Sequence, residues 1–420
     1  MKIKLQKKSY AEVLALPKEP PIVPRKPSRF LRGLINVISA FELGALRFKC
    51  TKVNMDALDK RKPTLYLMNH SCFTDMKIFE RVIPQRFNII ATSDSFVGQR
   101  DLLTSLGCVP TTKFVTDATL VRNMMYCFNK LKTSVLMFPE ASYSFDGTAT
   151  TLPHGLGKAV KLFGVQVVMI TTYGVFLHDP LYNGLQQRKT RASATMEYIL
   201  SPEQIKEMSA DEIFDKINGY FQFDNFRWQK DNGVKVDEPF RADHLDRVLY
   251  KCPHCNTEGQ MEGKGTTLTC HHCNKQWILD EYGYMRALQG ETEFDHVPTW
   301  YAWQRNCVAK EIDNGTYKLD VDVNVVVLKG TKAVYDIGAG HLTHDASGFT
   351  LTFDNGNATY TQPASASYSL YADYLWYEIG DVICIGNNDM LYYCFPQDKS
   401  VPVAKTRLAT EEIFKAIVKK

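Results

Sequence analysis

A histidine and an aspartate five residues apart are the first side chains in this 420-residue sequence that could do chemistry together. Residues 64–68 form an apolar run typical of a strand, and His70 and Asp75 follow it closely. On an ideal helix the two side chains would point about 140° apart, so they can meet only if His70 lies in the turn before the helix. Asp75 would then hold the Nδ1 proton, and Nε2 would be free to accept a proton from a hydroxyl group. The alternative is an ordinary capping turn with a polar histidine.

A second candidate group is the carboxyl group of Glu140. Residues 134–138 are another apolar run, and Pro139 and Glu140 stand at its end. Open α/β sheets bind their ligands at the carboxyl ends of the strands. We therefore expect His70 and Glu140 to lie at the same edge of a parallel sheet, where the carboxyl ends of its strands meet.

Several common catalytic signatures are absent from the sequence. It contains no Walker A loop, no G-x-G-x-x-G, no G-x-S-x-G and no H-E-x-x-H. Their absence excludes the most common nucleotide-binding, α/β-hydrolase and metalloprotease motifs.

The order and separation of these residues resemble the glycerophospholipid acyltransferases. That family carries an H-x₄-D motif and, further along the chain, F-P-E-G. Here residues 69–75 read NHSCFTD and residues 138–140 read FPE. The family's intermediate motif, a glycine followed six residues later by an arginine, corresponds to Gly107 and Lys113. The resemblance covers about residues 30–230, or half of the chain.

The resemblance implies a role for each matched residue. His70 would be the general base on the hydroxyl of the acceptor, and Asp75 would orient it. Glu140 would bind the glycerol portion of the acceptor, and Lys113 would stand where the family's arginine contacts phosphate. The implied enzyme is an O-acyltransferase of phospholipid biosynthesis, similar to the 1-acyl-sn-glycerol-3-phosphate acyltransferases. It would move a fatty acyl group from acyl-CoA, an acyl carrier protein or an acyl phosphate to a lysophospholipid.

Two departures from the family pattern concern the acceptor. Lys113 is a point charge and cannot make the bidentate contact of an arginine. The family's E-G-T-R is replaced by Glu140-Ala141-Ser142-Tyr143, so a second phosphate-binding arginine is missing and Ser142 and Tyr143 become candidate substrate contacts. Lysophosphatidic acid is the default acceptor. A lysophospholipid with a larger head group, or a less charged alcohol, is the alternative.

Four cysteines in two CxxC pairs indicate a structural zinc ribbon at residues 245–285. Each pair offers two thiolates from one tight turn, and structural Zn²⁺ takes four such ligands in a tetrahedron. A closed set of four leaves no open position for catalysis; a redox or iron site of the same spacing is the alternative. The few lysines around the pairs make nucleic acid an unlikely partner. The four expected ligands are Cys252, Cys255, Cys270 and Cys273.

Residues 63–200 alternate between strand-like and helix-like segments. That alternation predicts an α/β domain with a mostly parallel sheet flanked by helices. We place this domain at residues 29–235, after a basic, proline-rich arm at residues 1–28. The expected strands are 64–68, 87–91, 134–138 and 166–171, and the expected helices are 75–82, 117–131, 157–163 and a helical stretch over 202–228.

Residues 295–420 are rich in tyrosine, valine and threonine and contain many turn signals. They predict a β-rich, antiparallel C-terminal domain that ends in a helix over 411–419. It is weakly similar to pleckstrin-homology-like or GRAM-like domains. We interpret His341 and His344 in this region as an exposed turn rather than a metal site.

The charge of the chain is unevenly distributed. Residues 1–62 contain 15 Lys or Arg and 5 Asp or Glu, a net +10, whereas the whole chain carries only +4. A helix expected over residues 29–48 would place apolar side chains on one face between basic ends. These features fit an anionic membrane surface, with the helix lying in the interface; a core helix with basic ends is the alternative. The apolar residues are Phe30, Leu34, Val37, Ile38, Phe41 and Leu46.

The expected location is cytoplasmic and peripherally membrane-associated. No apolar stretch approaches the roughly 18 residues of a membrane-spanning helix, and the start of the chain lacks the pattern of a secretory signal. An odd count of 11 cysteines favours free thiols in a reducing compartment.

Two functions from other classes stay open at the level of the sequence. The changes at Lys113 and Tyr143 are compatible with a decayed acyltransferase-like domain that serves as a zinc-ribbon adaptor. Retention of His70, Asp75 and Glu140 argues against decay. The ribbon and the basic arm alone would also fit a nucleic-acid-binding protein, whose binding would weaken steeply with salt.

Overall fold

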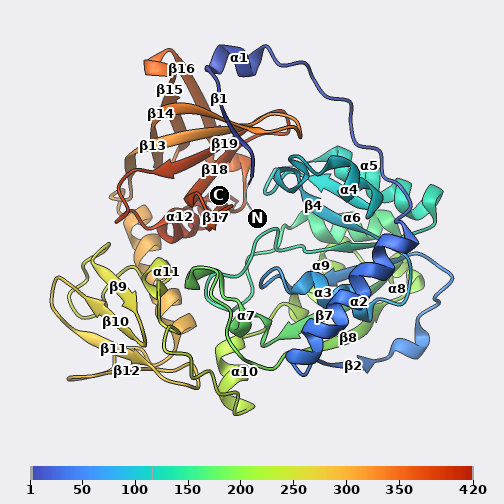
Figure 1. Ribbon diagram of the computed structural model, residues 1–420, viewed down its shortest axis with the longest axis horizontal. Coiled ribbons are helices and arrows are strands. Elements are labelled where there is room, and N and C mark those ends of the chain that lie inside the picture. Colours follow the sequence, from blue (N-terminus) through green and yellow to red (C-terminus); the bar gives the residue numbers. More distant parts are fainter. Residues whose placement is uncertain (1–2, 116, 419–420) are drawn as a thin grey trace.

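The computed structural model describes residues 3–115 and 117–418. Figure 1 shows three parts: an α/β domain on the right, a small yellow ribbon module at the lower left and a β-rich C-terminal domain at the upper left. No helix among the described residues is long and apolar enough to cross a membrane.

The N-terminal domain is built on a seven-stranded mixed sheet of order β2-β8-β7-β3-β6-β4-β5. Neighbouring strands are parallel except for β7 and β8, which pair antiparallel. The central strand β3 is buried at all five positions, as a strand covered by helices on both faces must be. The strands are β2 (Lys49–Val53), β3 (Thr64–Met68), β4 (Phe87–Thr92), β5 (Cys108–Thr111), β6 (Ser134–Met137), β7 (Gln166–Tyr173) and β8 (Ser193–Leu200).

The expected helices of this domain are present, two of them in altered form, and two short helices, α4 (Arg100–Ser105) and α7 (Val175–His178), were not predicted. The helix expected over 117–131 is α-helical only to Tyr126 and ends in a π-helical turn, Cys127–Leu131. The stretch 202–228 is divided into three helices, because Ser201, Ser209 and Asp224 each cap a new N-terminus. The helices are α2 (Arg29–Ala45), α3 (Asp75–Val82), α4 (Arg100–Ser105), α5 (Ala118–Tyr126), α6 (Gly155–Phe163), α7 (Val175–His178), α8 (Pro202–Glu207), α9 (Ala210–Tyr220) and α10 (Asn225–Asp231).

The ribbon module is a four-stranded antiparallel sheet of order β12-β11-β10-β9. Its aromatic centre is Trp277, which is fully buried and packs edge-on against Trp300 of the following helix at 5.0 Å between ring centres. The strands are β9 (Met261–Lys264), β10 (Thr267–Cys270), β11 (Gln276–Leu279) and β12 (Met285–Ala287).

The C-terminal domain is an antiparallel sheet of order β16-β15-β14-β13-β19-β18-β17, flanked by helices α11 and α12. The final helix begins at Val403, eight residues before its expected start. His341 and His344 lie within strand β14 and not in a turn, which corrects our interpretation. The elements are α11 (Val297–Asp313), β13 (Leu319–Leu328), β14 (Val334–Asp345), β15 (Gly348–Phe353), β16 (Ala358–Pro363), β17 (Tyr371–Trp376), β18 (Gly380–Gly386), β19 (Leu391–Pro396) and α12 (Val403–Val418).

The N-terminal arm crosses from one domain to the other rather than extending freely (Figure 1). Strand β1 (Leu5–Lys7) pairs in parallel with β14, and helix α1 (Tyr10–Leu14) follows it. Glu19 then accepts hydrogen bonds from Arg100 of α4 at 2.9 Å and from the Thr331 hydroxyl of the C-terminal domain at 2.7 Å. The arm therefore ties the two larger domains together.

One hydrophobic core runs through all three parts. Phe145 and Phe176 of the N-terminal domain belong to the same buried cluster as Trp277 of the ribbon and Tyr374 of β17. The Phe145 and Tyr374 rings lie 4.5 Å apart. Apolar burial of this kind stabilises the assembly of the parts as well as each part alone.

Candidate active site

His70 and Asp75 meet in the turn between β3 and α3. His70 Nδ1 lies 3.0 Å from Asp75 Oδ2. The same oxygen accepts the backbone N–H groups of Ser71 at 2.6 Å and Cys72 at 3.1 Å. Because α3 begins at Asp75, its carboxylate points back over the turn, which is the arrangement that the spacing required. Asp75 is fully buried, and the His70 side chain is about one-fifth exposed.

The surroundings of His70 favour the neutral imidazole. Burial lowers the pKa of His70, and the positive charge of Lys113 acts in the same direction, while Asp75 opposes both. The ring stacks on Phe138 with 3.9 Å between ring centres and lies 4.3 Å from the Tyr143 ring. With the Nδ1 proton held by Asp75, Nε2 carries the lone pair and can act as a base.

Glu140 lies behind His70 and holds the two loops of the site together. Its Oε1 accepts the backbone N–H of His70 at 3.1 Å, and its Oε2 accepts the backbone N–H of Thr150 at 2.8 Å. The side chain is fully buried, and burial raises the pKa of Glu140 to about 7. Both oxygens are thus engaged by the protein, so Glu140 fixes the position of His70.

The loop after Glu140 is held by a residue from the far end of the chain. Arg407 of α12 donates to Ser142 Oγ and to the backbone oxygen of Tyr143, both at 3.3 Å. Arg407 is buried, and its guanidinium lies 4.5 Å from the centre of the Phe145 ring. Ser142 is also buried, and its hydroxyl is used in this contact. No local pattern could have pointed to Arg407, because it lies 264 residues from its partner Tyr143.

Ala141 adopts a backbone conformation that favours glycine. Its φ is +56°, in the left-handed region. This is the position where the F-P-E-G motif of the glycerophospholipid acyltransferases carries its glycine. Alanine adopts this conformation at a cost that glycine would not have, because it carries a Cβ.

Lys113 lies at the edge of the site, two residues beyond β5. Its ammonium group is 3.9 Å from the centre of the Tyr371 ring of β17. Burial lowers the pKa of Lys113, whereas the carboxyl groups of Asp94 and Asp373 oppose that shift. Among the described residues, none forms a hydrogen bond with this ammonium group or pairs with it within 4.0 Å. Among the described residues, Lys113 thus contacts the Tyr371 ring rather than pairing with a carboxylate.

Cys72 lies inside the same turn but is unsuited to act as a nucleophile. Burial raises the pKa of its thiol well above the usual value, and the Asp75 carboxylate acts in the same direction. Its Sγ faces the backbone oxygen of Val175 at 3.6 Å. A thiol that stays protonated is a poor nucleophile.

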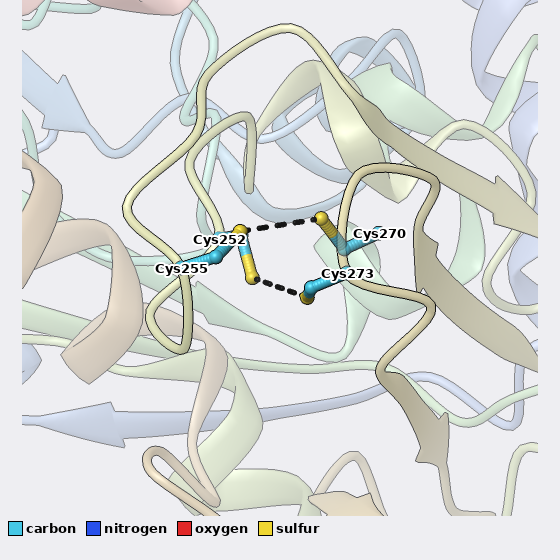
Figure 2. Close-up of side chains that lie close together, drawn as sticks. All are labelled: Cys252, Cys255, Cys270 and Cys273. Atoms are coloured by element: carbon cyan, nitrogen blue, oxygen red, sulfur yellow. Dashed lines mark hydrogen bonds between the residues drawn. The ribbon is translucent and has the colours of Figure 1, made fainter.

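The four cysteines of the ribbon module converge from two loops (Figure 2). The Sγ atoms of Cys252 and Cys273 are 3.8 Å apart, and those of Cys255 and Cys270 are 3.7 Å apart. A tetrahedron with Zn–S bonds of about 2.3 Å has edges of about 3.8 Å. All four thiols are free of disulfides, and their sulfur atoms lie within 4.8 Å of one another. This set could hold a metal ion, and its chemistry fits zinc.

A comparison with protein families gives a match to the segment that contains the candidate active site. Residues 49–173 match the family model described as Acyltransferase. That segment holds His70, Asp75, Lys113 and Glu140, and the match supports acyl transfer as its general chemistry. The matched segment covers under a third of the chain.

No curated protein matches the chain. Among the solved structures that are similar to it is the 1-acyl-sn-glycerophosphate (LPA) acyltransferase PlsC from Thermotoga maritima. That enzyme shares 14% identity over 46% of this chain and 77% of its own, with a TM-score of 0.37. So distant a likeness carries no argument about substrate or mechanism.

Proposed function

We propose that this protein is an O-acyltransferase that transfers a fatty acyl group from an activated donor to a hydroxyl group of a glycerol-phosphate-type lysolipid. His70 is the general base, and Asp75 orients it. The observation that carries the proposal is the contact of His70 Nδ1 with Asp75 Oδ2 at 3.0 Å, in a turn where backbone N–H groups fix the same oxygen. It holds the imidazole in the tautomer that a base requires.

The proposed reaction needs no covalent acyl-enzyme. His70 Nε2 takes the proton of the acceptor hydroxyl as its oxygen attacks the carbonyl carbon of the acyl donor. The bond from that carbon to the leaving sulfur, or to the phosphate oxygen of an acyl phosphate, then breaks. The imidazolium returns its proton to the leaving group, so that neutral His70 is restored. Asp75 stabilises the imidazolium formed in between.

The position of Lys113 favours an acceptor that carries a phosphate group. Its ammonium group has no ion-pair partner within 4.0 Å among the described residues, and it lies on the same edge of the sheet as His70. A phosphate at Lys113 would place the glycerol hydroxyl of a lysolipid towards the imidazole. Glu140 then serves the acceptor indirectly, by holding the His70 and Thr150 loops.

A structural zinc ion belongs to the same proposal. Cys252, Cys255, Cys270 and Cys273 would hold it, and it would supply a cross-link between two loops rather than a reactive centre. The first loop is tied to the rest of the protein, since Glu258 accepts hydrogen bonds from Lys251 at 3.0 Å and from Lys405 of α12 at 2.7 Å.

We further propose that helix α2 docks on an anionic membrane surface, where the lysolipid resides. Ser39 and Leu43 are its buried residues, whereas five large apolar side chains are exposed. Leu46, which the sequence placed on the same apolar face, is buried at the C-cap. Phe30 is 79% exposed and Phe41 78%. An outward apolar face of this size favours an interfacial helix over a core helix. The other exposed members are Leu34, Val37 and Ile38.

The test is acyl transfer by the purified full chain on liposomes. The acceptors are glycerol 3-phosphate, lysophosphatidic acid, and neutral and zwitterionic lysolipids, each offered with acyl-CoA, acyl carrier protein and acyl phosphate donors. His70→Ala is compared with His341→Ala, an exposed histidine of strand β14 outside both the candidate active site and the ribbon. We expect product with the wild type and with His341→Ala, and none with His70→Ala. Absence of product with every pair, or equal product with His70→Ala, would refute the proposal.

A further inference from the structure

The C-terminal domain forms one wall of the candidate active site. Tyr371 and Asp373 are two residues apart on β17, so their side chains leave the same face of the strand. That face is turned towards the N-terminal domain, because the Tyr371 hydroxyl donates to Asp94 Oδ2 at 2.8 Å and the Tyr371 ring lies against Lys113. Asp373 therefore enters the site from the opposite domain.

Asp373 brings a carboxyl group into the neighbourhood of Lys113 and Tyr143. Burial raises the pKa of Asp373 to about 7, and the positive charge of Lys113 opposes that shift and favours the carboxylate. Among the described residues, Asp373 forms no ion pair with Lys113 within 4.0 Å. Its Oδ1 accepts the backbone N–H of Tyr374 at 2.9 Å, which fixes the carboxyl group on the strand. Tyr371 thus contacts Lys113 directly, and Asp373 lies two residues further along the same strand face without pairing with that ammonium group.

We propose that Asp373 selects the head group of the acceptor, so that the site takes a lysophospholipid whose phosphate lies against Lys113 and whose ammonium group lies against Asp373. This inference rests on the proposed function and names the substrate class for the same site. A phosphodiester with an ammonium group presents one negative and one positive charge, which matches the pair. A phosphate monoester carries about −1.5 to −2 near pH 7 and would be repelled by Asp373.

A purely structural role for Asp373 makes a different prediction. If Asp373 only offset the charge of Lys113 across the domain interface, its removal would change the affinity for every phosphate-bearing acceptor in the same direction. Selection by Asp373 instead changes the ratio between acceptors with and without an ammonium group. The ratio is therefore the quantity to measure.

The experiment compares lysophosphatidylethanolamine and lysophosphatidic acid of one acyl chain length, with the zinc-loaded full chain. The ratio of their kcat/KM values is measured for the wild type, Asp373→Asn, Asp373→Glu and the control Asp389→Asn. Asp389 is an exposed residue of the same domain that forms an ion pair with the equally exposed Lys18. We expect the wild type to prefer the ethanolamine lipid and Asp373→Asn to lower that preference about tenfold, the loss of one half-buried charge contact.

The controls separate folding from selection. Asp373→Glu keeps the charge and is expected to keep the preference, and Asp389→Asn is expected to match the wild type. An unchanged ratio in Asp373→Asn, or a wild type that prefers lysophosphatidic acid, would overturn the inference while leaving the proposed acyl transfer intact. A wild type that acylates neither these two lipids nor glycerol 3-phosphate nor a neutral lysolipid would overturn the proposed function and this inference with it.

Discussion

The substitution Asp75→Asn tests the core of the proposed mechanism because the two oxygens of Asp75 have different surroundings. Oδ2 lies against His70 Nδ1 and accepts two backbone N–H groups, whereas Oδ1 is buried and has no hydrogen-bond partner among the described residues. The amide oxygen of an asparagine can replace Oδ2 and keep these contacts. Its NH₂ group must then bury two hydrogen-bond donors in the place of Oδ1, which has no hydrogen-bond partner among the described residues.

Two costs follow from this geometry. Burial of unsatisfied amide donors costs about 1–3 kcal/mol of folding free energy. Loss of the negative charge removes a charge-assisted hydrogen bond to the imidazolium, worth about 1.5–3 kcal/mol, from the transition state. The second loss corresponds to a fall in kcat/KM of about 10- to 150-fold. A larger fall, of up to about 10⁴-fold, would mean that the histidine had taken the wrong tautomer.

We also expect the pH profile of the activity to move in a defined direction in Asp75→Asn. Asp75 raises the pKa of His70 against the lowering by burial and by Lys113. His70 is active as a base when neutral, so activity rises as the pH rises through its pKa. Removing the Asp75 charge lowers that pKa further, and the acidic limb of the profile is expected to move to lower pH while its plateau falls.

The assay is kcat/KM as a function of pH, with unfolding in urea measured on the same samples. The matched control is Asp101→Asn, an exposed aspartate in the first turn of α4, which should leave the profile in place. Activity of Asp75→Asn within threefold of the wild type, or an acidic limb that moves to higher pH, would show that Asp75 does not serve His70 as a carboxylate.

Three further predictions concern other parts of the molecule. Ala141→Gly is expected to stabilise the chain by about 1 kcal/mol in urea unfolding, because φ is +56° there, and an unchanged or lower stability would contradict the strain. Phe41→Glu is expected to abolish flotation with anionic vesicles while the melting temperature stays constant, since the side chain is 78% exposed; undiminished flotation would rule out docking through α2. Cys255→Ser is expected to abolish stoichiometric zinc, measured by elemental analysis, and to lower the melting temperature of the whole chain, because ribbon and N-terminal domain share one core; full zinc retention would show that Cys255 is no ligand.

Local sequence patterns predicted the strands and helices whose own residues show a clear hydrophobic pattern. The bounds of β3 and α3 agree with the expected 64–68 and 75–82, because an apolar run followed by a polar turn and an amphipathic segment leaves few alternatives. Strands β2, β5 and β8 were not predicted. β2 is mostly polar and exposed, β5 is four residues long with a proline, and β8 alternates, so their pairing depends on neighbours far away in sequence.

The sequence by itself determined which groups could do chemistry and in which local frame. His70, Asp75 and Glu140 follow strand ends, and the two CxxC pairs of the ribbon can chelate from tight turns whatever surrounds them. These are short-range properties, since the spacing along the chain limits where each group can lie.

Only the tertiary structure decided what faces these groups. Arg407 holds the loop beside His70, although it lies 264 residues from Tyr143, its partner in that loop. Tyr371 and Asp373 of β17 lie on the side of the site that holds Lys113, and more than 250 residues separate them from it. The apolar side chains of α2 are the same in a core helix and in an interfacial helix, and only packing shows that they point outward. Burial, pairing and pKa are set by neighbours in space, and a single sequence does not record which distant residues those neighbours are.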